Sequence, residues 1–252
     1  MASKKIPLWV IVFWLAVWQV VSMVVGYSIL CPSPWLTLTK LWGLVGQASF
    51  WLSIATTLGR ISTGFLTATA TAVVVAVLSH LSKPVGELLS PLILVFKSVP
   101  VASFTILILI WFSSSYLAII IAFIMVMPLV YSNVLTAIEQ LDPDLNQMAT
   151  LFNLTSYTKI RYVLLPQIIP YFRSACLVGL GMSFKAGIAA ELIGLPKNSI
   201  GEQLYAAKLY LDTPSVFAWT VAIVILCFWY EKLFATAITW LCNRLEKVRW
   251  TA

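Results

Sequence analysis

Three charged residues interrupt long apolar stretches of this chain, and they are the first candidates for chemistry. Lys97, Lys185 and Glu191 each have mostly apolar neighbours in the sequence. A charge within a membrane-type stretch usually pairs with another charge or faces a cavity. One interpretation is structural, with Lys97 paired to Glu87, Lys185 paired to Glu191, or the lysines snorkelling. The other is a positive lining for an anionic solute. In both, we expect Glu191 to be a structural or gating residue.

Catalytic and metal-binding patterns are absent from the sequence. The single histidine, His80, falls in a short polar turn without a nucleophile to activate, and the nucleotide-binding pattern G-x4-GK[ST] does not occur. The cysteines lack paired metal-ligand spacing, and we expect no disulfide among Cys31, Cys176, Cys227 and Cys242. We therefore predict that the chain is not an enzyme, holds no metal and binds no cofactor of its own.

The composition places these residues in a membrane protein. The 252 residues are 61% hydrophobic and only 10% charged, whereas soluble domains carry about 25% charged residues. Since a helix needs roughly 20 apolar residues to cross a bilayer, we predict an all-α fold, a polytopic membrane helical bundle of about six transmembrane helices. The expected spans are 6–27, 58–80, 88–112, 116–138, 164–195 and 214–242, with 37–50 an amphipathic stretch at the outer surface and 196–213 a polar outer loop.

Small residues recur at four-residue spacing in the second and fifth spans. Such spacing gives a ridge along one helix face, where another helix can approach closely. The ridges are Gly64, Ala68, Ala72 and Ala76 in the second span, and Ala175, Gly179, Ser183 and Gly187 in the fifth. The third span contains Pro91 and Pro100, which predict a bend or an unwound piece.

Basic residues indicate how the bundle is oriented. The loops assigned to the inside hold Lys4, Lys5, Lys83, Lys159, Arg161, Arg173, Arg244, Lys247 and Arg249, and the outer stretches hold Lys40, Arg60, Lys197 and Lys208. Cytoplasmic loops carry the excess of lysine and arginine, so both termini are expected in the cytoplasm. The net charge of +7 therefore reflects orientation, and we expect the lipid bilayer, not nucleic acid, as the partner.

The longest polar insert of the second half, 137–172, is then cytoplasmic as well. Asp142 before Pro143 predicts a helix start, because the carboxylate can cap free amides and proline suits the first helical position. Asn153 predicts a left-handed stop, and Thr155 or Ser156 a second cap. Pro166 and Pro170 mark the entry into the fifth span.

An apolar stripe runs along the short helix of this insert, at Leu145, Met148, Ala149 and Phe152. One interpretation is an interfacial helix packed under its own bundle. The other is a knob that docks in a groove of a cytoplasmic partner.

Several motifs, in order, resemble those of permeases of binding-protein-dependent type I ABC importers, in the nitrate/sulfonate/taurine branch. The loop motif EAA-x3-G-x9-I-x-LP is matched in spacing by Gln147, Met148, Ala149, Asn153, Val163, Leu165 and Pro166, with Gln147 and Asn153 in place of the acidic residue and the glycine. Further likeness lies in Thr57-Leu58-x-Arg60, in Pro100 to Trp111-Phe112, and in Ala189-Ala190-Glu191-Leu192-Ile193-Gly194 followed by Ile200-Gly201.

The resemblance implies an assembly. Such permeases work as two transmembrane subunits, here expected to be a homodimer, with two ATPase subunits that bind ATP and Mg²⁺, and with a periplasmic or lipoprotein solute-binding protein. The loop helix would couple ATPase closure to the bundle, and the expected coupling residues are Asp142, Leu145, Gln147, Met148, Ala149, Phe152, Asn153 and Pro166. The implied pathway, for a small solute such as nitrate, a sulfonate or taurine, would include Lys97, Pro100, Lys185 and Glu191, with the ridged spans near the dimer axis.

The resemblance also implies a division of the chain and a location. Residues 1–55 would be an added N-terminal helix and outer stretch, and 56–250 the permease core with a cytoplasmic coupling loop at 139–166. The location would be the inner membrane. Two other functions stay open: an ATPase-independent channel or secondary transporter, for which Glu191 and Glu231 are the main ion-coupling candidates, and a membrane scaffold without a cavity.

Overall fold

The computed structural model describes residues 7–98 and 100–246, and this part of the chain is helical without strands. Lys4, Lys5, Lys247 and Arg249, and with them both expected cytoplasmic termini, lie outside the described residues. The elements are α1 (Leu8–Val25), α2 (Pro34–Val45), α3 (Ala48–Leu81), α4 (Lys83–Ser98), α5 (Val101–Trp111), α6 (Ser114–Glu139), α7 (Pro143–Leu151), α8 (Ser156–Lys159), the π-helix η1 (Ile160–Leu164), α9 (Leu165–Gly194), α10 (Ile200–Leu209) and α11 (Thr213–Glu246).

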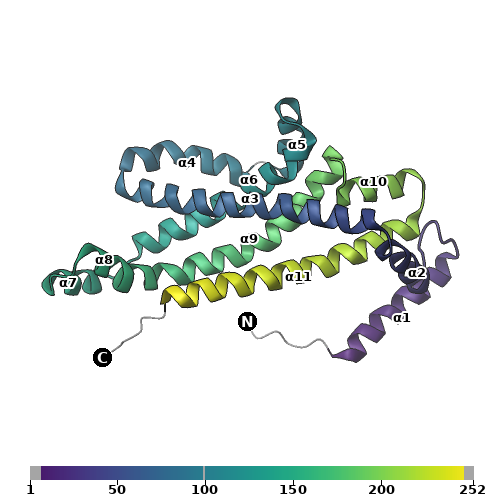
Figure 1. The fold of residues 1–252 in the computed structure, drawn as a ribbon, viewed down its shortest axis with the longest axis horizontal. Coiled ribbons are helices and arrows are strands. Elements are labelled where there is room, and N and C mark those ends of the chain that lie inside the picture. The colour runs from purple at the N-terminus through teal and green to yellow at the C-terminus, as the bar shows by residue number, and fades with distance from the viewer. Residues whose placement is uncertain (1–6, 99, 247–252) are drawn as a thin grey trace.

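Helices α3, α6 and α9 form the centre of the bundle (Figure 1). The two small-residue ridges explain their close packing, since every ridge residue is buried. A Cβ added at Gly64 of α3 would lie 2.4 Å from the Ile119 carbonyl oxygen of α6, and one added at Gly187 of α9 would lie 2.6 Å from Ile61 of α3. The ridges therefore serve the packing of helices inside one chain, and their residues do not line an open pathway.

The third expected span is broken into two helices. The axes of α4 and α5 differ by 110° across 99–100, where Pro100 precedes the first residue of α5. Pro91 lies inside α4 without ending it. The expectation of a bend in 88–112 is therefore confirmed next to Pro100, and α4 starts at Lys83, five residues before the expected boundary.

Two further boundaries differ from the expectation. Helix α3 begins at Ala48, ten residues before position 58, so with 34 residues it is longer than a bilayer crossing needs. The stretch 196–213, expected to be a loop, contains α10. The other spans agree with α1, α6, α9 and α11 to within two residues, apart from the end of α11 at Glu246.

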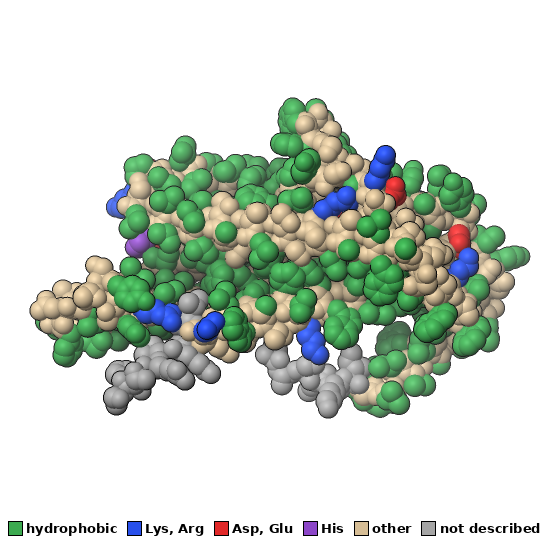
Figure 2. Space-filling model, viewed as in Figure 1, with side chains coloured by type: hydrophobic (Ala, Val, Ile, Leu, Met, Phe, Trp, Pro, Cys, Tyr) green, Lys and Arg blue, Asp and Glu red, His purple; other side chains and the backbone are tan. Residues whose placement is uncertain are grey.

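Five of the described helices are long and apolar enough to cross a membrane, and six segments are if the bent pair α4–α5 counts as one span. Figure 1 shows α7, α8 and the end of α11 at one end of the bundle, called the α7 end here, and α2 and α10 at the other, the α10 end. Figure 2 shows apolar side chains spread over the whole face, with few charged side chains between them. None of the α1 residues is buried in the chain, so this helix presents its sides to lipid or to another subunit.

One exposed ion pair fastens the α10 end. Lys40 of α2 donates to Asp212 Oδ2 at 3.1 Å, just before α11. Partial burial tends to raise the pKa of Asp212, but hydrogen bonds from Ser215 and Lys40 outweigh it, so the pKa lies below its usual value. The pair therefore stabilises this contact above the ordinary carboxyl pKa, and the contribution is lost as the pH falls through the lowered one.

Candidate functional site

Helix α7 starts as its sequence predicts. Asp142 is the N-cap, and its Oδ1 accepts a hydrogen bond from the Asp144 amide at 2.8 Å, while Pro143 occupies the first turn. The Asp142 amide in turn donates to Gln167 Oε1 at 2.9 Å. Because Gln167 belongs to α9, this bond ties the start of α7 to the first turn of a long membrane helix.

The end of α7 is a tight left-handed turn, as expected. Asn153 has a φ of 48°, a conformation that asparagine tolerates better than most residues. The Leu154 amide donates back to the Ala149 carbonyl at 3.0 Å. Thr155 then caps α8 by accepting from the Thr158 amide at 3.3 Å, so the chain reverses within a few residues.

The apolar stripe of α7 divides into a buried root and an exposed tip. Ala149 is 1% exposed, Leu145 and Met148 are 38% and 40% exposed, and Phe152 is 75% exposed. Leu151, which the periodicity did not single out, is 81% exposed. Apolar side chains gathered at a polar end of a membrane protein mark an interaction surface. We call Leu145, Met148, Leu151 and Phe152 the α7 tip.

A π-helix joins this knob to the bundle. Segment η1 lies between α8 and α9, and the Leu165 amide donates to Ile160 O, five residues back. Pro166 follows directly and has no amide hydrogen to donate. The chain therefore enters α9 through an irregular turn, and π-bulges of this kind often mark functional sites.

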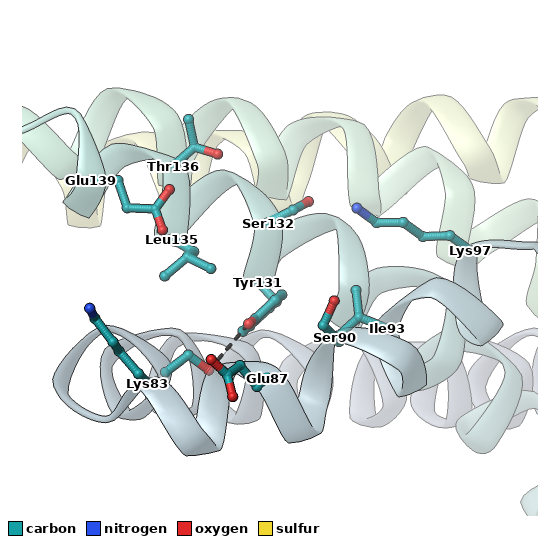
Figure 3. A pocket seen from close by; sticks show the side chains of 12 residues that line it. Lys83, Glu87, Ser90, Ile93, Lys97, Tyr131, Ser132, Leu135, Thr136 and Glu139 are labelled. Carbon is teal, nitrogen blue, oxygen red and sulfur yellow. Dashed lines mark hydrogen bonds between the residues drawn. The ribbon is translucent and has the colours of Figure 1, made fainter.

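A polar groove opens between α4 and α6 at the α7 end (Figure 3). This inner groove has a volume of about 400 Å³, and its polar lining includes Ser79, Lys83, Glu87, Ser90, Lys97, Tyr131, Ser132, Thr136 and Glu139. Tyr131 closes one side by donating to Ser79 Oγ at 3.2 Å. Polar side chains of this density are costly in a membrane-embedded bundle unless water or a solute reaches them.

A second cavity of about 530 Å³ lies at the α4–α5 break. This break cavity is lined by Phe96, Lys97, Ser98, Pro100 and Val101 before and after the break, by Met125, Pro128, Leu129 and Ser132 of α6, and by Met182 of α9. Lys97 and Ser132 line both cavities. Two of the residues expected in the pathway, Lys97 and Pro100, are thus brought together.

Lys185 and Glu191 lie elsewhere, and the ion pairs considered from the sequence are not found within residues 7–98 and 100–246. Lys185 is exposed on α9. Glu191 is fully buried and accepts from Thr57 Oγ1 at 2.7 Å and from Arg60 Nη1 at 3.4 Å. Its partner cation is therefore Arg60, not Lys185.

The Glu191 contacts organise the α10 end. Arg60 also donates to the Lys197 carbonyl at 3.2 Å, and Thr57 accepts from the Ile200 amide at 3.1 Å. Gly201 packs so closely that an added Cβ would lie 2.4 Å from the Glu191 carbonyl carbon. The motifs around Thr57-x2-Arg60, Glu191 and Ile200-Gly201 thus meet in one network that fixes the loop before α10.

Comparison with known proteins agrees with this architecture. Residues 64–235 match the family described as binding-protein-dependent transport system inner membrane component. The nitrate import permease protein NrtB of Synechococcus elongatus is 28% identical over 190 residues, covering 71% of this chain and 68% of the relative. The taurine transport system permease protein TauC of Escherichia coli is 24% identical, covering 85% and 80%. The bicarbonate transport system permease protein CmpB of S. elongatus is 26% identical over 152 residues, covering 60% and 54%.

Proposed function

Because the chain belongs to the family of inner-membrane components of binding-protein-dependent transport systems, it is the permease subunit of an ABC importer, and we propose that α7 passes the movement of a cytoplasmic ATPase to the bundle. The observation that carries this proposal is the exposed apolar α7 tip. An ATPase groove would cover these side chains, and the bond from Asp142 to Gln167 would transmit the displacement into α9.

The partners follow from this role. The family implies an ATPase and a solute-binding protein. We infer two ATPase subunits that carry the ATP and Mg²⁺, a second copy of this chain, and a periplasmic or lipoprotein binding protein at the α10 end. The α7 end would then be cytoplasmic, together with both termini. Basic residues belong to the elements at this end, namely Lys83, Lys159, Arg161 and Arg244. This agrees with the excess of basic residues on the cytoplasmic side of membrane proteins.

The solute class is inferred from chemistry that the relatives share. They are named for nitrate, bicarbonate and taurine. Two of these are anions, and taurine carries a sulfonate group. We infer a small solute with an anionic oxygen-rich group as the cargo of this chain.

A channel or secondary transporter is less well supported. Ion coupling needs an intramembrane carboxylate free to bind the ion. Glu191 is engaged by Thr57 and Arg60. Glu231, the other candidate, accepts a weak hydrogen bond from Cys227 at 3.5 Å and lies against Gly181 of α9. Neither carboxylate lines the inner groove or the break cavity.

Purification with the cognate ATPase tests the proposal. Phe152→Asp and Met148→Asp place a charge on the α7 tip, and we expect the co-purified ATPase to fall about tenfold or more, since a charge forced into an apolar contact costs several kcal/mol. Asn146→Asp is the matched control, because it adds the same charge at an exposed polar position of α7. ATP-independent uptake of nitrate, taurine or bicarbonate, or full ATPase retention in both tip variants, would overturn the proposal.

A further inference from the structure

The two cavities adjoin along α6, and together they are called the route here. They share Lys97 and Ser132, and their linings on α6 run from Met125 to Glu139. That separation of 14 residues corresponds to about 21 Å of helix. Since Met125 is near the middle of α6 and Glu139 is its last residue, the route leads from mid-span to the α7 end.

Among the described residues that line the break cavity, Lys97 alone carries a charge. Its amine has neither an ion pair nor a hydrogen bond with any residue that the structure describes. Figure 3 shows it extended from the end of α4 toward Ser132 of α6. The Lys97 side chain is exposed within the single chain, and an unpaired ammonium group in a membrane span is costly unless water or an anion meets it.

The hydroxyl groups beside Lys97 do not compete with it as hydrogen-bond donors to an anion. Ser132 Oγ donates to the Pro128 carbonyl at 2.8 Å, and Ser98 Oγ donates to the Leu94 carbonyl at 2.7 Å. Their hydrogens are thus directed to backbone oxygens, and only their lone pairs face the cavity. Lys97 is the side chain left there that can donate to an anion.

The charges change sign toward the mouth of the inner groove. Glu87 of α4 and Glu139 of α6 line it together with Lys83 (Figure 3). An anion is attracted at Lys97 and disfavoured beside the two carboxylates, so it is not held at the exit. A cation would be disfavoured at Lys97 and attracted by the two carboxylates.

We propose that Lys97 is the residue that selects anions in the translocation route, by donating directly to the anionic oxygen group of the solute in the break cavity. The proposal rests on the proposed function, because it assumes that a solute crosses this bundle. It separates the two intramembrane lysines considered from the sequence: Lys97 faces the route, whereas Lys185 lines neither cavity.

Transport by the reconstituted complex tests this assignment. The permease, its ATPase and its binding protein are placed in proteoliposomes, with nitrate, taurine and bicarbonate as separate probes. For the probe that the wild type accumulates, Lys97→Gln should lower uptake about tenfold or more, the effect of losing a hydrogen bond to a charged group. The rate of ATP hydrolysis should stay within about twofold, because coupling through α7 is unaffected.

Two control variants separate charge from structure. Lys97→Arg keeps the positive charge and should retain at least about half of the uptake, and Lys185→Gln, which removes the other lysine, should leave uptake unchanged. Unchanged uptake in Lys97→Gln, or equal losses in Lys97→Gln and Lys97→Arg, would overturn the assignment. A wild-type complex that accumulates none of the probes with ATP would instead contradict the proposed function.

A measurement on the wild type decides the matter if Lys97→Gln does not assemble. Acetylation of individual lysines in the purified complex is followed by mass spectrometry, with and without sodium methanesulfonate. We expect the anion to slow acetylation of Lys97 about threefold or more relative to Lys208, an exposed lysine at the α10 end. Equal effects at both lysines would refute anion binding at Lys97.

Discussion

Glu191 is the clearest case in which a single residue holds distant parts of the chain together. Its carboxylate is fully buried and meets Thr57 and Arg60, more than 130 positions earlier in the sequence. Through them it fixes the carbonyl of Lys197 and the amide of Ile200. A buried carboxylate is stable only when its partners remain in place, so this network makes the α10 end rigid.

Replacing Glu191 should therefore cost stability. Glu191→Ala leaves Arg60 without its carboxylate and Thr57 without its acceptor, and we expect a loss of roughly 3 kcal/mol. Glu191→Gln keeps an oxygen for Thr57 and should lose less. The measurement is the thermal unfolding midpoint of the protein in detergent.

The exposed Lys40–Asp212 ion pair provides a control for the stability loss expected in Glu191→Ala. Lys40→Ala removes an exposed partner of Asp212 and should change stability by less than about 1 kcal/mol. If Glu191→Ala unfolds at the same temperature as Lys40→Ala, the Glu191 network does not hold the loop before α10.

The sequence predicted a structural or gating role for Glu191 but considered the wrong partner. Lys185 is six residues earlier, which places it about 240° around the same helix, so the two side chains cannot meet. Lys97 and Glu87 both line the inner groove, but they are ten residues apart on α4, about 15 Å along the helix axis, which is too far for an ion pair. The true partner, Arg60, lies on α3 and becomes a neighbour only when the helices pack, so the local sequence could not identify it.

At the scale of elements, hydrophobic length and cap residues predicted most helices, and tertiary packing decided the rest. Spans such as α6 were placed to within two residues because the bilayer sets a minimum apolar length. Helix α10 was missed because its composition is loop-like, although Ser199 and Glu202 have the spacing of a capping box and Ser199 Oγ does accept from the Glu202 amide at 3.0 Å. That spacing could have revealed α10.

The close contact of α3 with α6 can be tested by two glycines of the same helix. A Cβ at Gly64 would lie 2.4 Å from the Ile119 carbonyl oxygen and 2.8 Å from Ala122 Cβ, whereas a Cβ at Gly59 would meet nothing within 4 Å. Gly64→Ala forces the helices apart and should destabilise the protein by about 1–3 kcal/mol. Gly59→Ala should be neutral, or more stable by up to about 1 kcal/mol, because alanine favours a helix.

Thermal unfolding of both alanine variants in the same detergent checks this prediction. The difference between them is informative because each adds one methyl group to α3. Equal midpoints would mean that the α3–α6 contact tolerates a methyl group and that the ridge is not a close-packing surface.

At the scale of the whole molecule, the described chain is asymmetric from end to end. The α7 end presents an irregular connection, with a short helix, a left-handed turn and a π-helix. The α10 end is fixed by the Glu191 network and the Lys40–Asp212 pair. The proposed function would use both properties, since the ATPase would move the α7 end while the α10 end would receive solute from a binding protein.

This asymmetry makes the orientation in the membrane a testable property of the chain. Cys31 lies between α1 and α2 at the α10 end and is partly exposed, whereas Cys176 and Cys242 are buried and Cys227 is half-buried within α11. If the α7 end is cytoplasmic, a membrane-impermeant maleimide should label Cys31 in intact spheroplasts.

Tyr157, 75% exposed beside the α7 tip, supplies the opposite reporter, because Tyr157→Cys in a Cys31→Ala background should be labelled only after permeabilisation. Labelling of Tyr157→Cys from outside would show that the topology is the opposite one. It would also contradict the docking of a cytoplasmic ATPase on α7, because the ATPase could not reach the tip. The basic residues favour the first result, since the transmembrane potential and the translocation machinery both retain lysine and arginine inside.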